Sequence, residues 1–168
     1  MNIRSETIQD YPAIAEVNIL AFGQENEAKL IAEIRDSDRY IPELSLVAEV
    51  EGLVVGHILF SYIDLVGEET FQVLGLAPMA VLPNFQRKGI GSALVQAGLE
   101  IANKRKEAIV IVLGHPPFYT RFGFEPSVNY AIASPFPVPE EFFMVKPLQS
   151  YQETYKGKIV YPPAFEKV

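Results

Sequence analysis

A chain of 168 residues, 49% of them hydrophobic, is long enough for one buried core, so a single domain is expected. Its net charge of −7 disfavours broad contact with nucleic acid and weakly favours neutral or cationic partners. The chain has no cysteine, which excludes disulfides, thiolate-bound zinc and a cysteine nucleophile, and its two histidines, His57 and His115, lack ligand-like spacing, so no metal site is predicted.

The chain has no pattern typical of secretion or membrane insertion. The first ten residues, MNIRSETIQD, lack the apolar core of a secretion signal. No later stretch provides the roughly 18 apolar residues that a bilayer-spanning helix needs. We therefore expect a cytoplasmic protein that contacts neither membrane nor nucleic acid.

The first part of the chain has the apolar spacing of two helices. Asp10 is a typical N-cap residue and Pro12 suits a first helical turn, so one helix is expected from there to about residue 21. A second helix is expected over 25–36. Its solvated side is predicted to carry Glu25, Glu27 and Glu33.

Three apolar runs then have the composition of strands. The runs at 45–50 and 53–63 flank a two-residue turn and predict an antiparallel hairpin. The run at 73–82, VLGLAPMAVL, is apolar on both faces and is typical of a central strand. Pro78 within it has no N–H for a strand ladder, which favours a bulge at that point. His57 lies in the second strand, where we expect a hydrogen-bonded sheet residue.

A turn and a further helix follow the central strand. The helix is expected to start near Gly89, and the run at 108–113 is again apolar on both faces. Strand, helix and strand together predict a βαβ unit with parallel strands. A short helix is expected over 116–122, and the segment from 125 onward, with seven of the 13 prolines, should hold edge strands and loops. The fold class is α/β with a mixed sheet.

The start of the third helix is suited to binding an anion. The first N–H groups of a helix have no intrahelical partners and favour negative charge. Gly89 and Gly91 have no side chains to keep a ligand from the backbone. Further donors are expected from Gln86, Arg87, Lys88 and Ser92. A phosphate or pyrophosphate is the natural occupant, and the alternative is an ordinary glycine-containing helix start with a solvated Arg-Lys pair.

Two common phosphate motifs do not fit this turn. A dinucleotide fingerprint would need glycine at Leu94, and no acidic ribose ligand ends the next strand. The P-loop pattern occurs nowhere in the chain. What does fit is the form Q/R-x-x-G-x-G/A over 86–91.

This turn resembles the loop of the GNAT superfamily, the acyl-CoA-dependent N-acetyltransferases. The segment FYTRFGFEP at 118–126 is similar to the family's F-Y-x-x-x-G-F element, and LGLAPMAVLP, GHPPFYTRFGF and YPPAF look most like the YhbS-type bacterial group. The likeness follows the order of elements from about residue 3 to 126. It implies one acyl-CoA N-acyltransferase domain over 1–168, with 127–168 as a Pro- and aromatic-rich extension of the sheet, and a sheet flanked by helices and splayed between strands 73–82 and 108–113.

The resemblance also implies acetyl-CoA, or coenzyme A, as co-substrate. In the family the loop wraps the pyrophosphate, and the pantetheine arm enters the splayed sheet as a pseudo-strand, meeting backbone groups at Met79 and Val81. The implied cofactor residues are Met79, Ala80, Val81, Gln86, Arg87, Lys88, Gly89, Ile90, Gly91, Ser92, His115 and Phe118. His115 stands where relatives often have Asp or Asn, and its alternatives are a base near neutral pH or an ordinary loop residue.

The implied reaction is direct attack of a neutral primary amine on the thioester. A backbone N–H near Val81 would stabilise the oxyanion, and Tyr119 matches the family's general-acid tyrosine. A phenol, with a reference pKa of about 10, is a weak acid for a thiolate, so a hydrogen bond to sulfur is a second interpretation and a core aromatic a third. The general base is open between water and a carboxylate, the candidates being Glu27, Glu33, Asp64 and Glu69.

Other functions stay open at this point. The domain could bind acyl-CoA without turnover, as a sensor, because fold does not decide activity. The tail could form a protein interface, which exposed Phe142 and Phe143 would favour. The acceptor is a small-molecule amine, a peptide N-terminus or a protein lysine, and edge strands in the tail are compatible with a homodimer.

Overall fold

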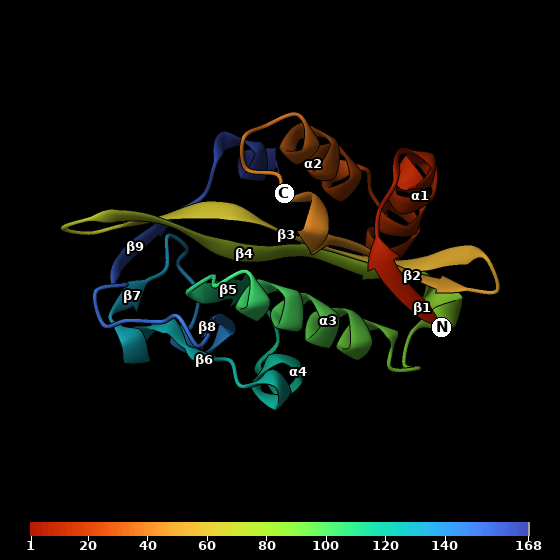
Figure 1. Cartoon of the computed structure of the whole chain (residues 1–168). Helices are drawn as coiled ribbons and strands as arrows, with labels where there is room; N and C mark the ends of the chain where they lie inside the picture. Colours follow the sequence, from red (N-terminus) through yellow and green to blue (C-terminus); the bar gives the residue numbers. More distant parts are fainter. Residues whose placement is uncertain (168) are drawn as a thin grey trace.

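The computed structural model describes residues 1–167, which form one mixed sheet with helices on both faces (Figure 1). Helices α1 (Tyr11–Phe22) and α2 (Asn26–Arg35) cover one face, and α3 (Ile90–Lys104) covers the other. The short helix α4 (Pro116–Tyr119) lies below α3 in the view of Figure 1. The strands are β1 (Asn2–Ser5), β2 (Ser45–Val50), β3 (Leu53–Val66), β4 (Thr70–Val81), β5 (Ile109–Leu113), β6 (Glu125–Pro126), β7 (Ile132–Ala133), β8 (Phe143–Pro147) and β9 (Gly157–Val160).

The strand order confirms the mixed α/β sheet and the predicted βαβ unit. The sheet runs β1-β2-β3-β4-β5-β8-β6, and β9 pairs with the outer end of β3 and with β7. β4 and β5, which flank α3 in the sequence, pair in parallel, as do β7 and β9, and the other described pairs are antiparallel. The hairpin β2–β3 has the predicted position, but β3 and β4 are longer than predicted and form an extended hairpin.

β4 and β5 separate soon after they meet, as the resemblance implied. Their parallel ladder has two residue pairs, Leu74 with Val110 and Gly75 with Ile111. Beyond Gly75, β4 continues along β3 to Val81, whereas β5 continues along β8. The sheet therefore splays, and one edge of β4 is left without a strand partner from that point.

Pro78 lies in the bulge that the sequence predicted. In the antiparallel ladder of β3 and β4, Phe60 pairs with Leu76 and Ile58 pairs with Met79. Two residues of β4, Ala77 and Pro78, therefore stand opposite one residue of β3, which is the count of a β-bulge. A missing N–H at Pro78 costs little because no β5 partner faces it.

Helix α1 begins where it was expected, but the side chain of Asp10 does not have the predicted role of an N-cap. Pro12 lies in the first turn and Gly23, with a φ of +71°, ends the helix in the left-handed region. The Asp10 carboxylate does not cap α1. Instead it accepts hydrogen bonds from the backbone N–H of Thr7 at 2.7 Å and from Arg4 at 2.7 and 2.9 Å. The side chain therefore ties β1 to the helix start, and the Arg4 guanidinium lowers the pKa of Asp10 to about 2.

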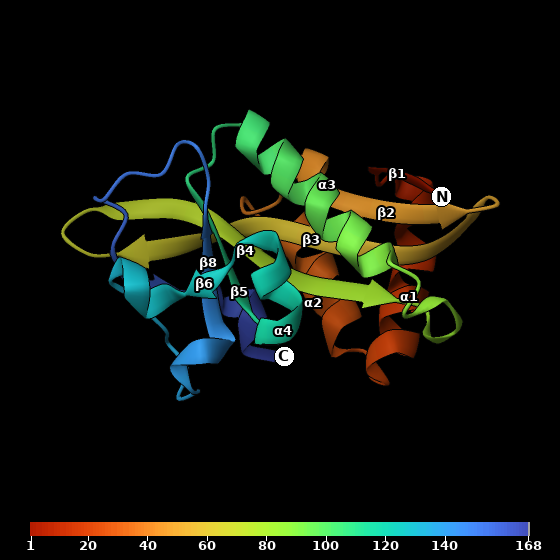
Figure 2. The ribbon, with the colours of Figure 1, turned by 90° about the horizontal axis from the view of Figure 1, so that it is seen from below.

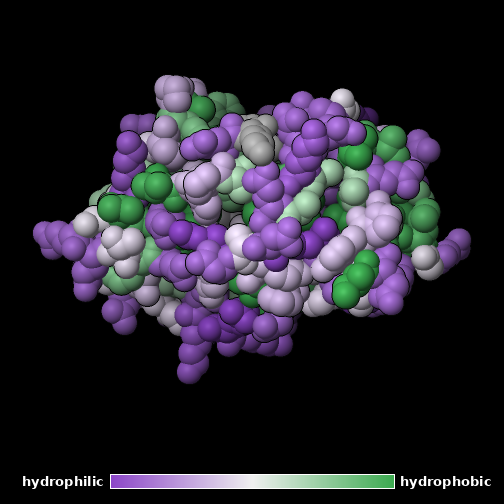
Figure 3. Space-filling model, turned by 90° about the horizontal axis from the view of Figure 1, so that it is seen from above, coloured by the Kyte–Doolittle hydropathy of each residue, from purple (hydrophilic) through white to green (hydrophobic). Residues whose placement is uncertain are grey.

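The core is divided by the sheet into two layers. In β3, successive side chains point to opposite faces, so Phe60 packs with Leu94 under α3, while Leu59 packs with Ile14 of α1 and Ile31 of α2. Figure 2 shows α3 lying diagonally across the sheet on its side. On the opposite face, hydrophobic residues at the surface form small separate patches among polar ones (Figure 3). The sheet is thus buried on both faces, which agrees with the apolar β4 and β5 sequences.

Substituting Gly98 with alanine should destabilise the fold, although alanine favours helices elsewhere. A Cβ at this position in α3 would lie 2.1 Å from Cε1 of Phe60, whose side chain is fully buried. We expect a loss of about 1–3 kcal/mol in the free energy of unfolding, measured by urea denaturation. Gly91→Ala in the same helix is the control, because its Cβ would meet no atom closer than 3.6 Å. Equal stability of the two variants would contradict this close packing.

The tail joins the sheet and does not present the expected aromatic surface. Phe143 in β8 is only 1% exposed and packs in the core with Ile111, and Phe142 is half-buried. Exposed Phe142 and Phe143, which would have favoured a tail interface, are therefore not found. The extent of the domain over 1–168 stays a prediction. No helix within residues 1–167 has the length and apolar character needed to cross a bilayer.

Candidate active site

Two cavities adjoin at the splayed edge of β4. The first, here called the loop cavity, has a volume of about 440 Å³ and lies at the start of α3. The second, the cleft cavity, has about 310 Å³ and lies between the diverging ends of β4 and β5. Met79 lines both. A long ligand can therefore lie along α3's start with its far end in the cleft.

The loop cavity gathers most of the predicted cofactor residues. Nine of the twelve line it: Met79, Val81, Gln86, Arg87, Gly89, Ile90, Gly91, Ser92 and Phe118. Nearly all of them come from one continuous segment, which is why a sequence motif could identify them. Within residues 1–167, no three His, Asp or Glu side chains cluster in a way that could hold a metal ion.

The backbone of the turn is shaped to face an anion. Arg87 and Gly89 have φ angles of +63° and +82°, which curl the loop before α3 starts at Ile90. No side chain caps the first turn of α3. The free N–H groups and the positive end of a 15-residue helix therefore point toward the cavity. At Gly91, a Cβ would lie 3.7 Å from Sδ of Met79 and 3.9 Å from the ring of Phe118, so the glycine keeps this wall open.

Three predicted cofactor residues lie elsewhere. The side chain of Ala80 is buried among the residues under α1 and α2. Lys88 is exposed, with its ammonium 5.4 Å from the centre of the Phe85 ring. His115 lines the cleft cavity. Successive side chains of a strand point to opposite faces of the sheet. Since Met79 points toward the cavity, the side chain of its neighbour Ala80 points away from it.

Arg121 is a loop-cavity residue that the sequence reasoning missed. Its Nη2 donates a hydrogen bond to Oγ of Ser92 at 2.8 Å, and its guanidinium lies 5.4 Å from the Phe118 ring centre. It brings a second guanidinium to the cavity beside Arg87. The only indication in the sequence of a role for Arg121 was its position in FYTRFGF, the segment similar to the family's F-Y-x-x-x-G-F element.

Tyr119 is both a packed aromatic and a cavity residue. It is 8% exposed, its ring packs edge-on against Phe118 and Phe124, and it lines the cleft cavity. Gly114 makes room for this ring, since a Cβ there would lie 2.3 Å from Cε2 of Tyr119. Burial raises the pKa of Tyr119 to about 12. The phenol is therefore a neutral hydrogen-bond donor over the whole physiological pH range.

Comparison with known proteins identifies the family. Residues 2–127 match the model of the acetyltransferase (GNAT) domain. The chain belongs to the GNAT acetyltransferase family. It is 38% identical to the uncharacterized N-acetyltransferase YjhQ of Escherichia coli K12 over 155 residues, which is 89% of this chain and 86% of YjhQ. It is 37% identical to the uncharacterized N-acetyltransferase YhbS of the same strain, covering 86% of each chain.

Two solved structures share the whole arrangement. The crystal structure of Escherichia coli YhbS in complex with CoA superimposes with a TM-score of 0.88 at 33% identity, covering 98% of this chain and 91% of that one. A GNAT acetyltransferase from Brucella melitensis in complex with acetyl-CoA gives 0.80 at 31% identity, covering 98% and 97%. The resemblance identified in the sequence, the splayed α/β fold and the enzyme class are thereby confirmed.

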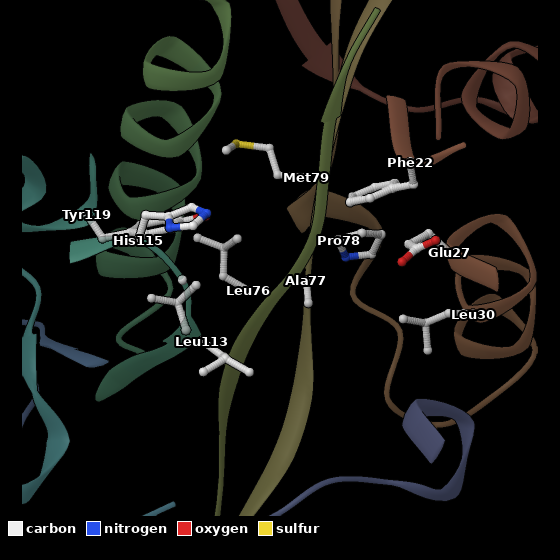
Figure 4. Close-up of a pocket in the computed structure, with 12 residues that line it drawn as sticks. Phe22, Glu27, Leu30, Leu76, Ala77, Pro78, Met79, Leu113, His115 and Tyr119 are labelled. Carbon is white, nitrogen blue, oxygen red and sulfur yellow. The ribbon is translucent and has the colours of Figure 1, made fainter. Parts of the chain in front are cut away.

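In this GNAT acetyltransferase the cleft cavity has walls from both sides of the sheet. Figure 4 shows His115 and Tyr119 on one side of β4 and Glu27, Phe22 and Leu30 on the other. Its apolar character comes from β4, β5 and the two N-terminal helices. Residues distant in the sequence thus meet at the point where the strands diverge.

The GNAT fold brings one of the four candidate carboxylates to this cleft. Glu27 lines it and is half-buried, so this side chain of the polar face of α2 is turned toward the cleft. Asp64 is paired instead with Arg39, at 2.9 and 3.1 Å. Glu69 lies at the β3–β4 turn, beside Lys156. Glu33 is not among the residues that line the cavity.

His57 lies outside both cavities, and only one of its two ring nitrogens has a hydrogen-bond partner among the described residues. Its Nε2 is 3.0 Å from Oγ of Ser45, and this hydroxyl donates to Glu6 at 2.6 Å. Nε2 must therefore carry the proton, and Nδ1 is a buried acceptor with no partner among residues 1–167. Burial lowers the pKa of His57 and keeps the ring neutral. The expectation of a fully hydrogen-bonded sheet residue is wrong for this nitrogen.

Proposed function

We propose that this protein transfers the acetyl group of acetyl-CoA to a primary amine by direct attack, without a covalent enzyme intermediate. The observation that carries the proposal is that the loop cavity and the cleft cavity lie next to each other, with Met79 in the wall of both. It supports a cofactor whose pyrophosphate lies against the start of α3 and whose thioester lies in the cleft near Tyr119. The crystal structures of the YhbS and Brucella relatives with CoA and acetyl-CoA support the same cofactor.

The loop cavity supplies what a pyrophosphate requires. Free N–H groups at the start of α3 and the guanidinium groups of Arg87 and Arg121 give charge-assisted hydrogen bonds. The unpaired edge of β4 beyond Gly75 offers backbone groups to the amides of pantetheine, in the manner of an added strand. Met79 and Val81 are the residues we assign to that edge.

The chemistry then balances with this chain's own groups. The amine nitrogen forms a bond to the thioester carbon, the carbon–sulfur bond breaks, and the proton that the amine loses ends on the CoA sulfur. A backbone N–H near Val81 stabilises the oxyanion. Tyr119, with a pKa of about 12, is too weak an acid to protonate a thiolate efficiently, so its role is to donate a hydrogen bond to the departing sulfur.

Isothermal titration with acetyl-CoA tests the cofactor site. A tryptophan at Gly89 would fill the loop cavity, so we expect Gly89→Trp to weaken binding at least about 100-fold through loss of charge-assisted hydrogen bonds. Gly52→Trp is the matched control, because Gly52 has a similar φ of +78° and also no atom near its Cβ position, but lies in the β2–β3 turn. Equal affinity of Gly89→Trp and wild type would refute the site, and binding without turnover on any amine would favour the sensor.

A further inference from the structure

We propose that Glu27 selects the acceptor, and that the acceptor is a small primary amine carried on an apolar carbon skeleton. The inference rests on the proposed function, since it places the amine next to a thioester in the cleft cavity. It assigns the amine nitrogen to the Glu27 carboxylate and the carbon skeleton to the apolar wall around it. Three features of the cleft support this arrangement.

The first feature is an isolated negative charge. Glu27 is the only acidic side chain among the described residues that line the cleft cavity. It is half-buried, and Nε2 of Gln24 holds its two oxygens at 3.1 and 3.2 Å. No described Lys or Arg forms an ion pair with it, unlike Glu25, the residue just before α2, which pairs with Lys29 at 3.5 Å. A cationic amine would supply the missing partner.

The second feature is the apolar surface around this carboxylate. Pro78 and Leu30 lie beside Glu27, and Phe22 lies next to it at the end of α1 (Figure 4). Phe22 and Leu113 are 42% and 45% exposed, so large hydrophobic side chains stand uncovered at the rim of the cavity. An aliphatic or aromatic skeleton would cover them, whereas a second charge on the acceptor would lose its hydration against them.

The third feature is the size of the cavity. About 310 Å³ is near the lower end of the range of ligand pockets, roughly 300–1,000 Å³, and the acetyl end of the cofactor must share it. A small amine fits this space better than a long polyamine. An amino acid is disfavoured as well, because its carboxylate would lie close to Glu27 and repel it.

The arrangement of side chains also orients the amine. Glu27 approaches from α2 on one side of β4, and Tyr119 and His115 approach from the other side (Figure 4). Because both groups of side chains line one cavity, an amine held at Glu27 would share that cavity with the sulfur end of the cofactor near Tyr119. Its excess proton leaves to water at the open rim before attack, so Glu27 acts by positioning the nitrogen.

The test measures acetyl-CoA consumption with a panel of amines, after acetyl-CoA binding has been confirmed by titration. The apolar members are 2-phenylethylamine and isoamylamine, and the comparison members are spermidine, lysine and phenylalanine. We expect the apolar amines to be acetylated with the highest kcat/KM. Glu27→Gln should raise their KM about tenfold and leave the acetyl-CoA Kd unchanged, as expected for a part-exposed hydrogen bond to a charge. Phe22→Ala should raise KM for 2-phenylethylamine as well.

Glu25→Gln is the matched control, since it removes a carboxylate from the same helix end that pairs with Lys29 outside the cavity, and its KM should equal that of wild type. An unchanged KM in Glu27→Gln, or a preference for spermidine, lysine or phenylalanine, would overturn the inference while leaving the proposed function intact. Acetyl-CoA binding without acetylation of either apolar amine would also overturn it. Failure of the wild type to bind acetyl-CoA would overturn the proposed function first, and this inference with it.

Discussion

Tyr119→Phe is expected to lower kcat for acetyl transfer by about 100-fold and to leave the Kd for acetyl-CoA within about twofold. The substitution keeps the ring, which fills the space beside Gly114 and contacts Phe118 and Phe124, and removes only the hydroxyl. General-acid and hydrogen-bonding groups contribute roughly 10²–10⁴-fold to such steps. We expect the lower end, because a phenol with a pKa of about 12 stabilises the leaving thiolate without full proton transfer. Steady-state kinetics with any accepted amine measures the effect.

Tyr130→Phe is the control for this prediction. The hydrogen bond to Glu125 raises the pKa of Tyr130 to about 12 as well, but this tyrosine lies outside both cavities. Its removal should not change kcat. Gly114→Ala provides a complementary variant, since it keeps the Tyr119 hydroxyl and displaces the ring, and it should also lower kcat. If Tyr119→Phe turned over like wild type, Tyr119 would be a core aromatic only.

Glu6→Gln is expected to lower the free energy of unfolding by about 3–5 kcal/mol, as for other buried ion pairs that lose one partner. The Glu6 side chain is 1% exposed, and its two oxygens accept four hydrogen bonds, two of them from Arg35 at 2.8 and 2.9 Å. The other two come from Tyr40 and Ser45, both at 2.6 Å. An amide NH2 in place of either oxygen would face two donors and leave Arg35 without its counter-charge. Urea denaturation followed by circular dichroism measures the loss.

This network also predicts how stability depends on pH. Burial alone would raise the pKa of Glu6, but the interactions with His57, Arg35, Ser45 and Tyr40 outweigh it and lower the pKa well below the ordinary 4.5. A carboxylate with a lowered pKa contributes stability that is complete above its unfolded value and is lost as the pH falls below it. His57, whose pKa is lowered from 6.5 by burial, adds a loss that begins as the pH falls through 6.5.

Between about pH 7 and pH 9 we therefore expect a constant free energy of unfolding, which declines below 6.5 and falls more steeply below 4.5. Glu6→Gln should show a smaller slope in the steep acidic range. Glu49→Gln is the matched control, because Glu49 forms a more exposed pair with Arg4 at 3.1 Å and should cost less than about 1 kcal/mol. Equal losses in the two variants, or an unchanged acid slope in Glu6→Gln, would count against the proposed role of the buried network.

Much of the proposed cofactor site was determined by the sequence alone. The turn at 86–91, the strand before it and the helix after it are contiguous, and each depends on local properties: an apolar run, glycines that permit positive φ, and a helix start with free N–H groups. Local sequence fixes such features because the interacting groups are neighbours in the chain. This is why most of the predicted cofactor residues line one cavity, and why the bulge at Pro78 was predicted from a missing N–H.

The proposed acceptor side was decided only by tertiary structure. The sequence gives the same pattern for Glu25, Glu27 and Glu33, an acidic residue on or beside an amphipathic helix. Only the packing of α2 against the sheet places Glu27, and not the other two, at the cleft. His57 lay in an apolar run, and nothing nearby in the sequence indicated that Glu6 and Ser45 would share its buried network. Contacts across the chain depend on how elements pack over the sheet, and periodicity along one element carries no information about that packing.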